Sequence, residues 1–179
     1  MIYKSFKTKN GQTIILRNLK CEDLDDFLDL MNSIANEHGI HGREKEITRE
    51  EAADILANTL SKISRGETIH IVAESNSKVL GVCFVNRDQP PSRCGHSGEL
   101  GVEIKKEYRN IGMGTELIKA IIVECKKMGL KLLKLAVADT NKVALHVYKK
   151  VGFIECGRVP KQFYHQGKYI DCIWMYKEL

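Results

Sequence analysis

The chain has 179 residues, of which 43% are hydrophobic and 28% are charged, and its formal net charge at pH 7 is +5. These values are typical of a soluble globular protein with one domain, which we expect to span residues 1–179. Its apolar runs are shorter than the ~18 residues of a membrane span, its N-terminus lacks the apolar region of a secretory signal, and its lysines are dispersed. We therefore expect neither a membrane nor nucleic acid among its partners.

The first half of the chain predicts one strand followed by two helices. Residues 13–19 form a short apolar run after the turn signal Asn10-Gly11. Residues 21–39 carry apolar side chains at helical spacing, with acidic residues early and Gly39 after the end. A second helix begins at Thr48, which forms a capping box with Glu51. The apolar positions of the first helix are Leu24, Phe27, Leu28, Met31 and Ile34.

The second half alternates strands with helices. A hairpin around residues 75–77 is predicted to join two strands, and a helix that begins at Gly114 is predicted to end at Gly129. The other predicted elements are strands at 99–104 and 130–138, a short helix within 141–153, and two strands within 161–177 around Gln166-Gly167. The order β-α-α-β-β-β-α-β-α-β-β predicts an α/β (α+β) fold, a mixed sheet with helices packed on it.

The cysteines are widely scattered, and no two of them have the Cys-x-x-Cys spacing of a zinc site or a thioredoxin-like motif. Reduced thiols are the simplest interpretation, and they predict a cytoplasmic protein without a metal site. The cysteines are Cys21, Cys83, Cys94, Cys125, Cys156 and Cys172.

The stretch "EYRNIGMGTEL" at residues 107–117 places two glycines where a strand passes into a helix. Unpaired N–H groups at a helix N-terminus bind anions, and Gly112 and Gly114 would let a phosphate approach the backbone. Arg109 adds a fixed positive charge. The pattern alone is weak, because Leu117 replaces the third glycine of a dinucleotide fingerprint. A tight turn without any ligand is the alternative.

Two motifs in the expected order resemble the GCN5-related N-acetyltransferase (GNAT) superfamily. "YRNIGMG" after "ELGVEIKKE" resembles its R-x-x-G-x-G segment, and "KLLKLAV", Asn141 and "ALHVYKKVGF" resemble its second signature. The tail "GKYIDCIWMYK" is similar to that of the branch with polyamine and ribosomal-protein acetyltransferases. The resemblance implies a mostly antiparallel central sheet, flanked by helices and splayed between the strands near 99–104 and 130–138. It also implies one N-acetyltransferase domain that transfers acetyl groups from acetyl-CoA directly to primary amines.

The resemblance also assigns the cofactor contacts. The pantetheine arm of acetyl-CoA would lie along the 102–104 strand, where main-chain groups left unpaired by the splay can bind it. The pyrophosphate would lie on the backbone amides of 110–115, beside Arg109. The alternatives are a plain buried strand and, for Asn141, a simple helix N-cap. The cofactor-binding residues implied are Val102, Glu103, Ile104, Arg109, Asn110, Ile111, Gly112, Met113, Gly114, Thr115, Asn141 and Tyr148.

Catalysis requires an acid for the departing thiolate and a base for the amine. Tyr148 is the candidate acid, because a phenol with pKa ~10 is protonated at neutral pH; the alternative is a half-buried core tyrosine. Glu99 is the first choice of base, since related enzymes often place a glutamate early on this strand, and His96 is the second. Glu103 is the third candidate, and we expect it to be solvated or ion-paired instead.

The acceptor amine is left open: a polyamine, another small amine, or a protein N-terminus or lysine. By the resemblance, the first two helices and the closing hairpin form its cleft, and carboxylates such as Glu37 in the segment 36–46 could receive a cation. Two other classes of function are a non-catalytic CoA-binding or sensing module and, less favoured, a nucleotide-binding regulator. The sequence neither shows nor excludes a homodimer, which is common in the superfamily.

Overall fold

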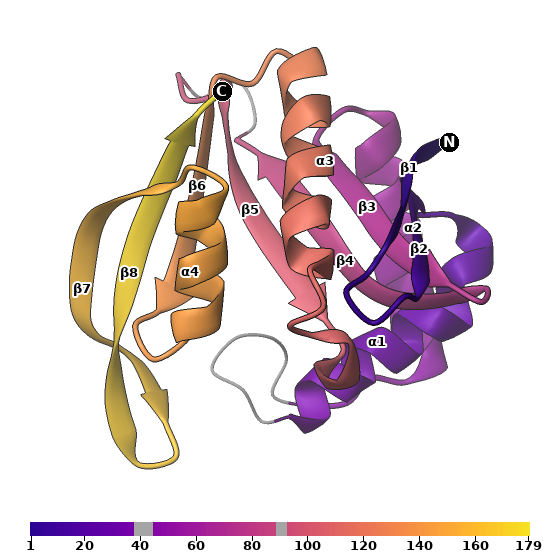
Figure 1. The fold of residues 1–179 in the computed structure, drawn as a ribbon, viewed down its shortest axis with the longest axis horizontal. Helices are drawn as coiled ribbons and strands as arrows, with labels where there is room; N and C mark the ends of the chain where they lie inside the picture. Colours follow the sequence, from indigo (N-terminus) through magenta and orange to yellow (C-terminus); the bar gives the residue numbers. More distant parts are fainter. Residues whose placement is uncertain (38–44, 89–92) are drawn as a thin grey trace.

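The computed structural model describes residues 1–37, 45–88 and 93–179, which form one eight-stranded sheet with helices on both faces (Figure 1). The strand order across the sheet is β1-β2-β3-β4-β5-β6-β8-β7. All neighbouring strands are antiparallel except β5 and β6, which are parallel. The strands are β1 (Ile2–Lys7), β2 (Thr13–Asn18), β3 (Thr68–Ser75), β4 (Lys78–Arg87), β5 (Ser97–Ile104), β6 (Leu132–Ala138), β7 (Ile154–His165) and β8 (Lys168–Glu178).

The helices cover the sheet in two pairs. Apolar residues of α3 pack with those of the strands in the larger buried cluster, and α4 lies against the same cluster. Residues of α1 and α2 form a second cluster with β3 and β4 on the opposite face. The helices are α1 (Leu24–Asn36), α2 (Arg49–Ser64), α3 (Met113–Lys127) and α4 (Lys142–Lys150), with short 3₁₀ turns at Cys21–Asp23 and Lys106–Tyr108.

Local sequence signals explain several element boundaries. The Thr48 hydroxyl accepts a hydrogen bond from Glu51 N, and the Glu51 carboxylate accepts one from Thr48 N, so the predicted capping box is confirmed. Asn76 and Ser77 both have positive φ, at 49° and 59°, which fits the tight hairpin predicted between β3 and β4. The predicted mixed, mostly antiparallel fold is confirmed. Gly39, predicted to end the first helix, lies outside the described residues.

Two details of the predicted order are wrong. The prediction began with β2, but β1 precedes it as an edge strand and pairs with β2 from Ile2↔Arg17 to Lys7↔Thr13. Neither face of β1 is fully buried, so its sequence lacks the alternation of apolar and polar residues that would have predicted a strand. The strand predicted to begin near residue 161 begins at Ile154, because β7 is an exposed edge strand ordered by its pairing with β8.

Candidate functional site

The two parallel strands in the middle of the sheet diverge. β5 pairs with β6 only from Ser97↔Leu132 to Glu99↔Lys134, although both strands continue beyond that point. No strand in the described part of the chain joins β5 to β6 past Glu99, and Figure 1 shows the two separating toward their C-terminal ends. β6 therefore does not pair with this part of β5, and an extended ligand could lie along it as a strand would. The splay expected from the family resemblance is confirmed.

Helix α3 begins at the open end of this gap. Its N-cap is Gly112, whose φ of 94° is left-handed and suits glycine. A Cβ on Gly112 would meet nothing within 4 Å, so the space above the helix N-terminus is open. The N–H groups of the first turn of an α-helix have no intrahelical acceptor. A helix N-terminus of this kind can bind an anion; the phosphate site predicted from the glycine pattern stays a prediction.

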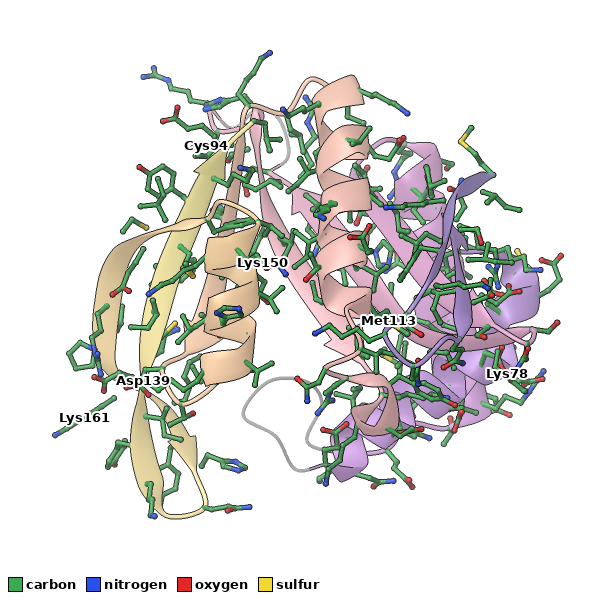
Figure 2. All side chains as sticks on the ribbon, viewed as in Figure 1. Lys78, Cys94, Met113, Asp139, Lys150 and Lys161 are labelled. Carbon is green, nitrogen blue, oxygen red and sulfur yellow. The ribbon has the colours of Figure 1, made fainter. Side chains whose placement is uncertain are left out.

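Both helices that follow the diverging strands start at the same end of the sheet. Met113 marks the start of α3, and Asp139 lies just after β6 and before α4 (Figure 2). Asn141 is the N-cap of α4, where its Oδ1 accepts a hydrogen bond from Ala144 N at 3.1 Å. The simple capping role weighed for Asn141 is therefore present in the structure.

Arg109, predicted to face the phosphate, is held by protein groups. Its Nε donates to Ile104 O at 2.8 Å, and Nη1 and Nη2 donate to the Glu37 carboxylate at 2.6 and 2.7 Å. Glu37 was expected among the acceptor-binding carboxylates, and the rest of that segment, residues 38–44, lies outside the described residues. The ion pair ties the end of α1 to the loop that precedes α3.

Tyr148 lies on α4 and packs into the larger core cluster, with its ring centroid 5.9 Å from that of Phe153. Burial raises the pKa of the Tyr148 phenol, and the nearby Cys83 thiol adds to the shift. Cys83 belongs to β4, the strand beside β5. The phenol is therefore protonated at neutral pH and can donate a proton.

Two of the three candidate bases lie on β5, and the third lies in the turn before it. Glu99 is exposed and is the last residue of β5 that pairs with β6, at the closed end of the gap. Glu103 is half-buried beside Val82 of β4, farther toward the open end. His96 is exposed in the turn before β5, where its carbonyl accepts from Lys131 N at 2.8 Å. Glu99 is thus the candidate nearest to the point where the strands part.

A close contact across β4 and β5 was missed in the sequence analysis. A Cβ on Gly101 would lie 2.3 Å from Cζ of Phe84, so a larger residue here would have to displace this ring. Phe84 also stacks on His70 of β3, with ring centroids 5.2 Å apart and planes at 15°. A glycine inside a predicted strand is the signal that could have indicated such an approach.

The described residues include no group of three or more His, Cys, Asp or Glu side chains that could hold a metal ion. None of the helices described is long and apolar enough to cross a membrane. All six cysteines are free thiols.

Comparisons with known proteins agree with this geometry. The sequence profile of the Acetyltransferase (GNAT) family matches residues 28–153. An uncharacterized N-acetyltransferase of Schizosaccharomyces pombe is 28% identical over 145 residues, which cover 80% of this chain and 82% of that protein.

Solved structures share the fold. A GNAT-family acetyltransferase from Streptococcus pneumoniae matches with a TM-score of 0.83 and 28% identity, over 93% of this chain and 99% of that one. A Salmonella typhimurium protein solved with its cofactor acetyl-CoA matches with a TM-score of 0.82 and 16% identity, over 93% of this chain and 94% of that one. The chain therefore belongs to the acetyltransferase (GNAT) family, which its sequence resembles, and is an N-acetyltransferase.

Proposed function

We propose that residues 1–179 form one domain that transfers the acetyl group of acetyl-CoA directly to a primary amine, in the cytoplasm and without a metal. The observation that carries this proposal is the gap between β5 and β6, which opens beside the N-terminus of α3, where Gly112 is the N-cap. A strand that its neighbour leaves and a helix N-terminus without a side-chain cap suit the amide-bearing arm and the pyrophosphate of coenzyme A.

The backbone amides of residues 110–115 would hold the pyrophosphate, and the edge of β5 from Val102 to Ile104 would hold the pantetheine arm. The open space above Gly112 supports the first assignment. The second is supported by the end of β5–β6 pairing at Glu99. When bound, acetyl-CoA supplies an activated thioester. A main-chain N–H in the gap would polarise its carbonyl and stabilise the oxyanion.

Tyr148 would protonate the departing thiolate, and its raised pKa keeps the proton in place until then. Glu99 would accept the proton of the amine, directly or through water, with His96 as the second choice. Asn141 would contact the cofactor in addition to its capping role. Glu103 would contribute main-chain contacts to the pantetheine arm.

The acceptor would be a polyamine, another small amine, or a protein N-terminus or lysine, received between the first two helices and the β7–β8 hairpin. Arg109 would act on the pyrophosphate mainly by holding the loop, since Glu37 already offsets its charge. A non-catalytic CoA-binding module would keep the gap without needing either Tyr148 or a base.

The test is a calorimetric titration with acetyl-CoA, followed by a panel of amines (spermidine, amino acids, aminoglycosides and short peptides) with detection of the released thiol. We expect micromolar binding and turnover with one class of amine. Binding without turnover on any amine, together with no hydrolysis of acetyl-CoA, would favour the CoA-binding module. Failure to bind acetyl-CoA would contradict the proposed cofactor site.

A further inference from the structure

The face of the sheet turned away from α3 and α4 carries side chains on both sides of the gap between β5 and β6. Alternate residues of β5, β6 and β8 pack into the buried cluster beneath α3 and α4, so the residues between them point to the opposite face. Figure 1 views the sheet from the side of α3 and α4, so we call this opposite face the far face. Its residues beside the gap are Phe84, Glu99, Gly101, Glu103, Lys134, Ala136, Trp174 and Tyr176.

Two aromatic residues lie on either side of the gap on the far face. Phe84 of β4 pairs with Gly101 of β5, and its ring lies over that glycine. Across the gap, Trp174 of β8 pairs with Ala136 of β6. Gly101 and Ala136 each lie two residues past the last pair of β5 with β6, so these four residues form one row across the sheet. Glycine and alanine therefore border the gap, and an aromatic residue flanks each of them.

The helices described in the structure leave this row partly accessible. The buried cluster beneath α1 and α2 extends to β3 and β4 but, among the described residues, includes none of β5, β6 or β8. Phe84 lies at the margin of that cluster, half-buried and stacked on His70. Trp174 is half-buried, although its neighbours Ile173 and Met175 are buried on the other face. Part of each ring is therefore available to a small molecule that reaches the gap from the far face.

The charges on the far face favour a cation. Glu99 is exposed two residues before Gly101, and Glu103 is half-buried two residues after it. Lys134, the cation of the same face, donates from Nζ to Asp88 Oδ2 at 2.9 Å, so its charge is offset. Carboxylates and the faces of aromatic rings both attract an ammonium group. A substrate that brings its own carboxylate would instead be repelled by these two glutamates.

We propose that the acceptor is a primary amine that carries no carboxylate beside its amino group, bound on the far face with its carbon chain between Phe84 and Trp174. This inference rests on the proposed function. The pantetheine arm proposed along residues 102–104 enters from the open end of the gap, so its thioester would lie in the row flanked by these two rings. The amine nitrogen would form the new C–N bond as the C–S bond breaks. One N–H proton would pass to Glu99, and the departing thiolate would receive the proton of Tyr148.

The test compares matched acceptors that differ only in the carboxylate: 1,5-diaminopentane with L-lysine, and 2-phenylethylamine with L-phenylalanine. Release of the CoA thiol is measured at saturating acetyl-CoA, and the affinity for acetyl-CoA is measured by calorimetry. Trp174→Leu and Phe84→Leu each replace a ring of the far face by an aliphatic side chain. Phe6→Leu, at a half-buried phenylalanine on β1, is the matched control.

In the wild type, we expect kcat/KM to be at least about tenfold higher for the amine than for the amino acid of a pair. Each ring variant should raise the KM for that amine about fivefold or more, with unchanged acetyl-CoA affinity, and Phe6→Leu should behave as the wild type. The comparison within each pair needs only the wild type, so it stands even if a ring variant does not fold.

Two results would overturn the inference and leave the proposed function standing, provided that acetyl-CoA binds and is turned over. They are an amino acid used as well as its matched amine, and an unchanged KM in either folded ring variant. Absence of acetyl-CoA binding, or of turnover with every acceptor of the two pairs, would overturn the inference together with the function on which it rests.

Discussion

The guanidinium of Arg109 binds both carboxylate oxygens of Glu37, 72 residues away in sequence, at 2.6 and 2.7 Å. A third bond, from Arg109 Nε to Ile104 O, fixes the same side chain to the end of β5. Arg109 therefore joins the end of the diverging strand, the loop before α3 and the end of α1. In the proposed enzyme, these parts serve the pantetheine arm, the pyrophosphate and the acceptor.

Glu37→Ala should raise the KM for acetyl-CoA several-fold, because the loop before α3 loses its anchor on α1. The pair is partly exposed, so the free energy of unfolding should change by less than about 1 kcal/mol. Steady-state kinetics and urea unfolding measure the two effects. Asp25→Ala is the matched control, since its ion pair with Arg49 is on the open surface. A lower KM would mean instead that Glu37 competes with the pyrophosphate for Arg109.

Gly112→Glu should weaken acetyl-CoA binding by at least about tenfold. The new side chain would fill the open space above the helix N-terminus and place a negative charge where the pyrophosphate is proposed to bind. Calorimetry measures the effect. Gly129→Glu is the control, because Gly129 also has a left-handed φ, 78°, and open space around it, but lies after the other end of α3. Equal affinities in the two variants would remove the pyrophosphate assignment.

Tyr148→Phe should lower kcat by about 10²-fold or more, the usual contribution of a general acid, with little change in acetyl-CoA affinity. Because its pKa is raised, Tyr148 should remain protonated through pH 6–9 and should not itself produce a loss of activity at the basic end of that range. The pH–rate profile and a calorimetric titration check both statements. Tyr176→Phe, a half-buried tyrosine on β8, is the control. An unchanged kcat would eliminate the acid role.

Glu99→Gln should abolish or displace the acidic limb of the kcat/KM profile, because a base must be deprotonated to accept the proton of the amine. The exposed position of Glu99 predicts little effect on folding. The profile of His96→Gln, measured in parallel, distinguishes the second candidate. If Glu99→Gln retains the wild-type profile and His96→Gln loses the limb, the base is His96. If neither changes it, Glu103 or water takes the proton.

His70 should make the protein less stable in acid. Its folded pKa of about 4 lies below the unfolded value of 6.5, so the unfolded state binds the proton more readily. The contribution of neutral His70 to the free energy of unfolding is therefore fully present above pH 6.5, and about 3 kcal/mol of it is lost as the pH falls to 4. Urea unfolding measured at several pH values across this range gives the free energy of unfolding as a function of pH. This free energy should fall less steeply with falling pH in His70→Phe than in the wild type. The exposed His146→Phe should leave the slope unchanged, and identical slopes in all three proteins would contradict this assignment.

Local signals in the sequence were sufficient for many elements. The capping box of α2, the hairpin after β3 and the amphipathic pattern of α3 depend on residues within a few positions of each other, so the sequence predicts them directly. The sequence analysis missed β1, and it placed the start of β7 near residue 161 instead of at Ile154. Both are exposed edge strands, ordered by pairing with a neighbour rather than by a buried face.

The sequence by itself determined the family, the positions of the glycines at the start of α3 and the strand that diverges, because motifs and periodicity are properties of neighbouring residues. Tertiary structure alone decided that Arg109 meets Glu37 and that the ring of Phe84 lies against Gly101. It also stacked His70 on Phe84 and, by burial, lowered the pKa of His70. These relationships join residues from different elements, and burial and distance, which set their energies, exist only once the sheet and its helices have packed.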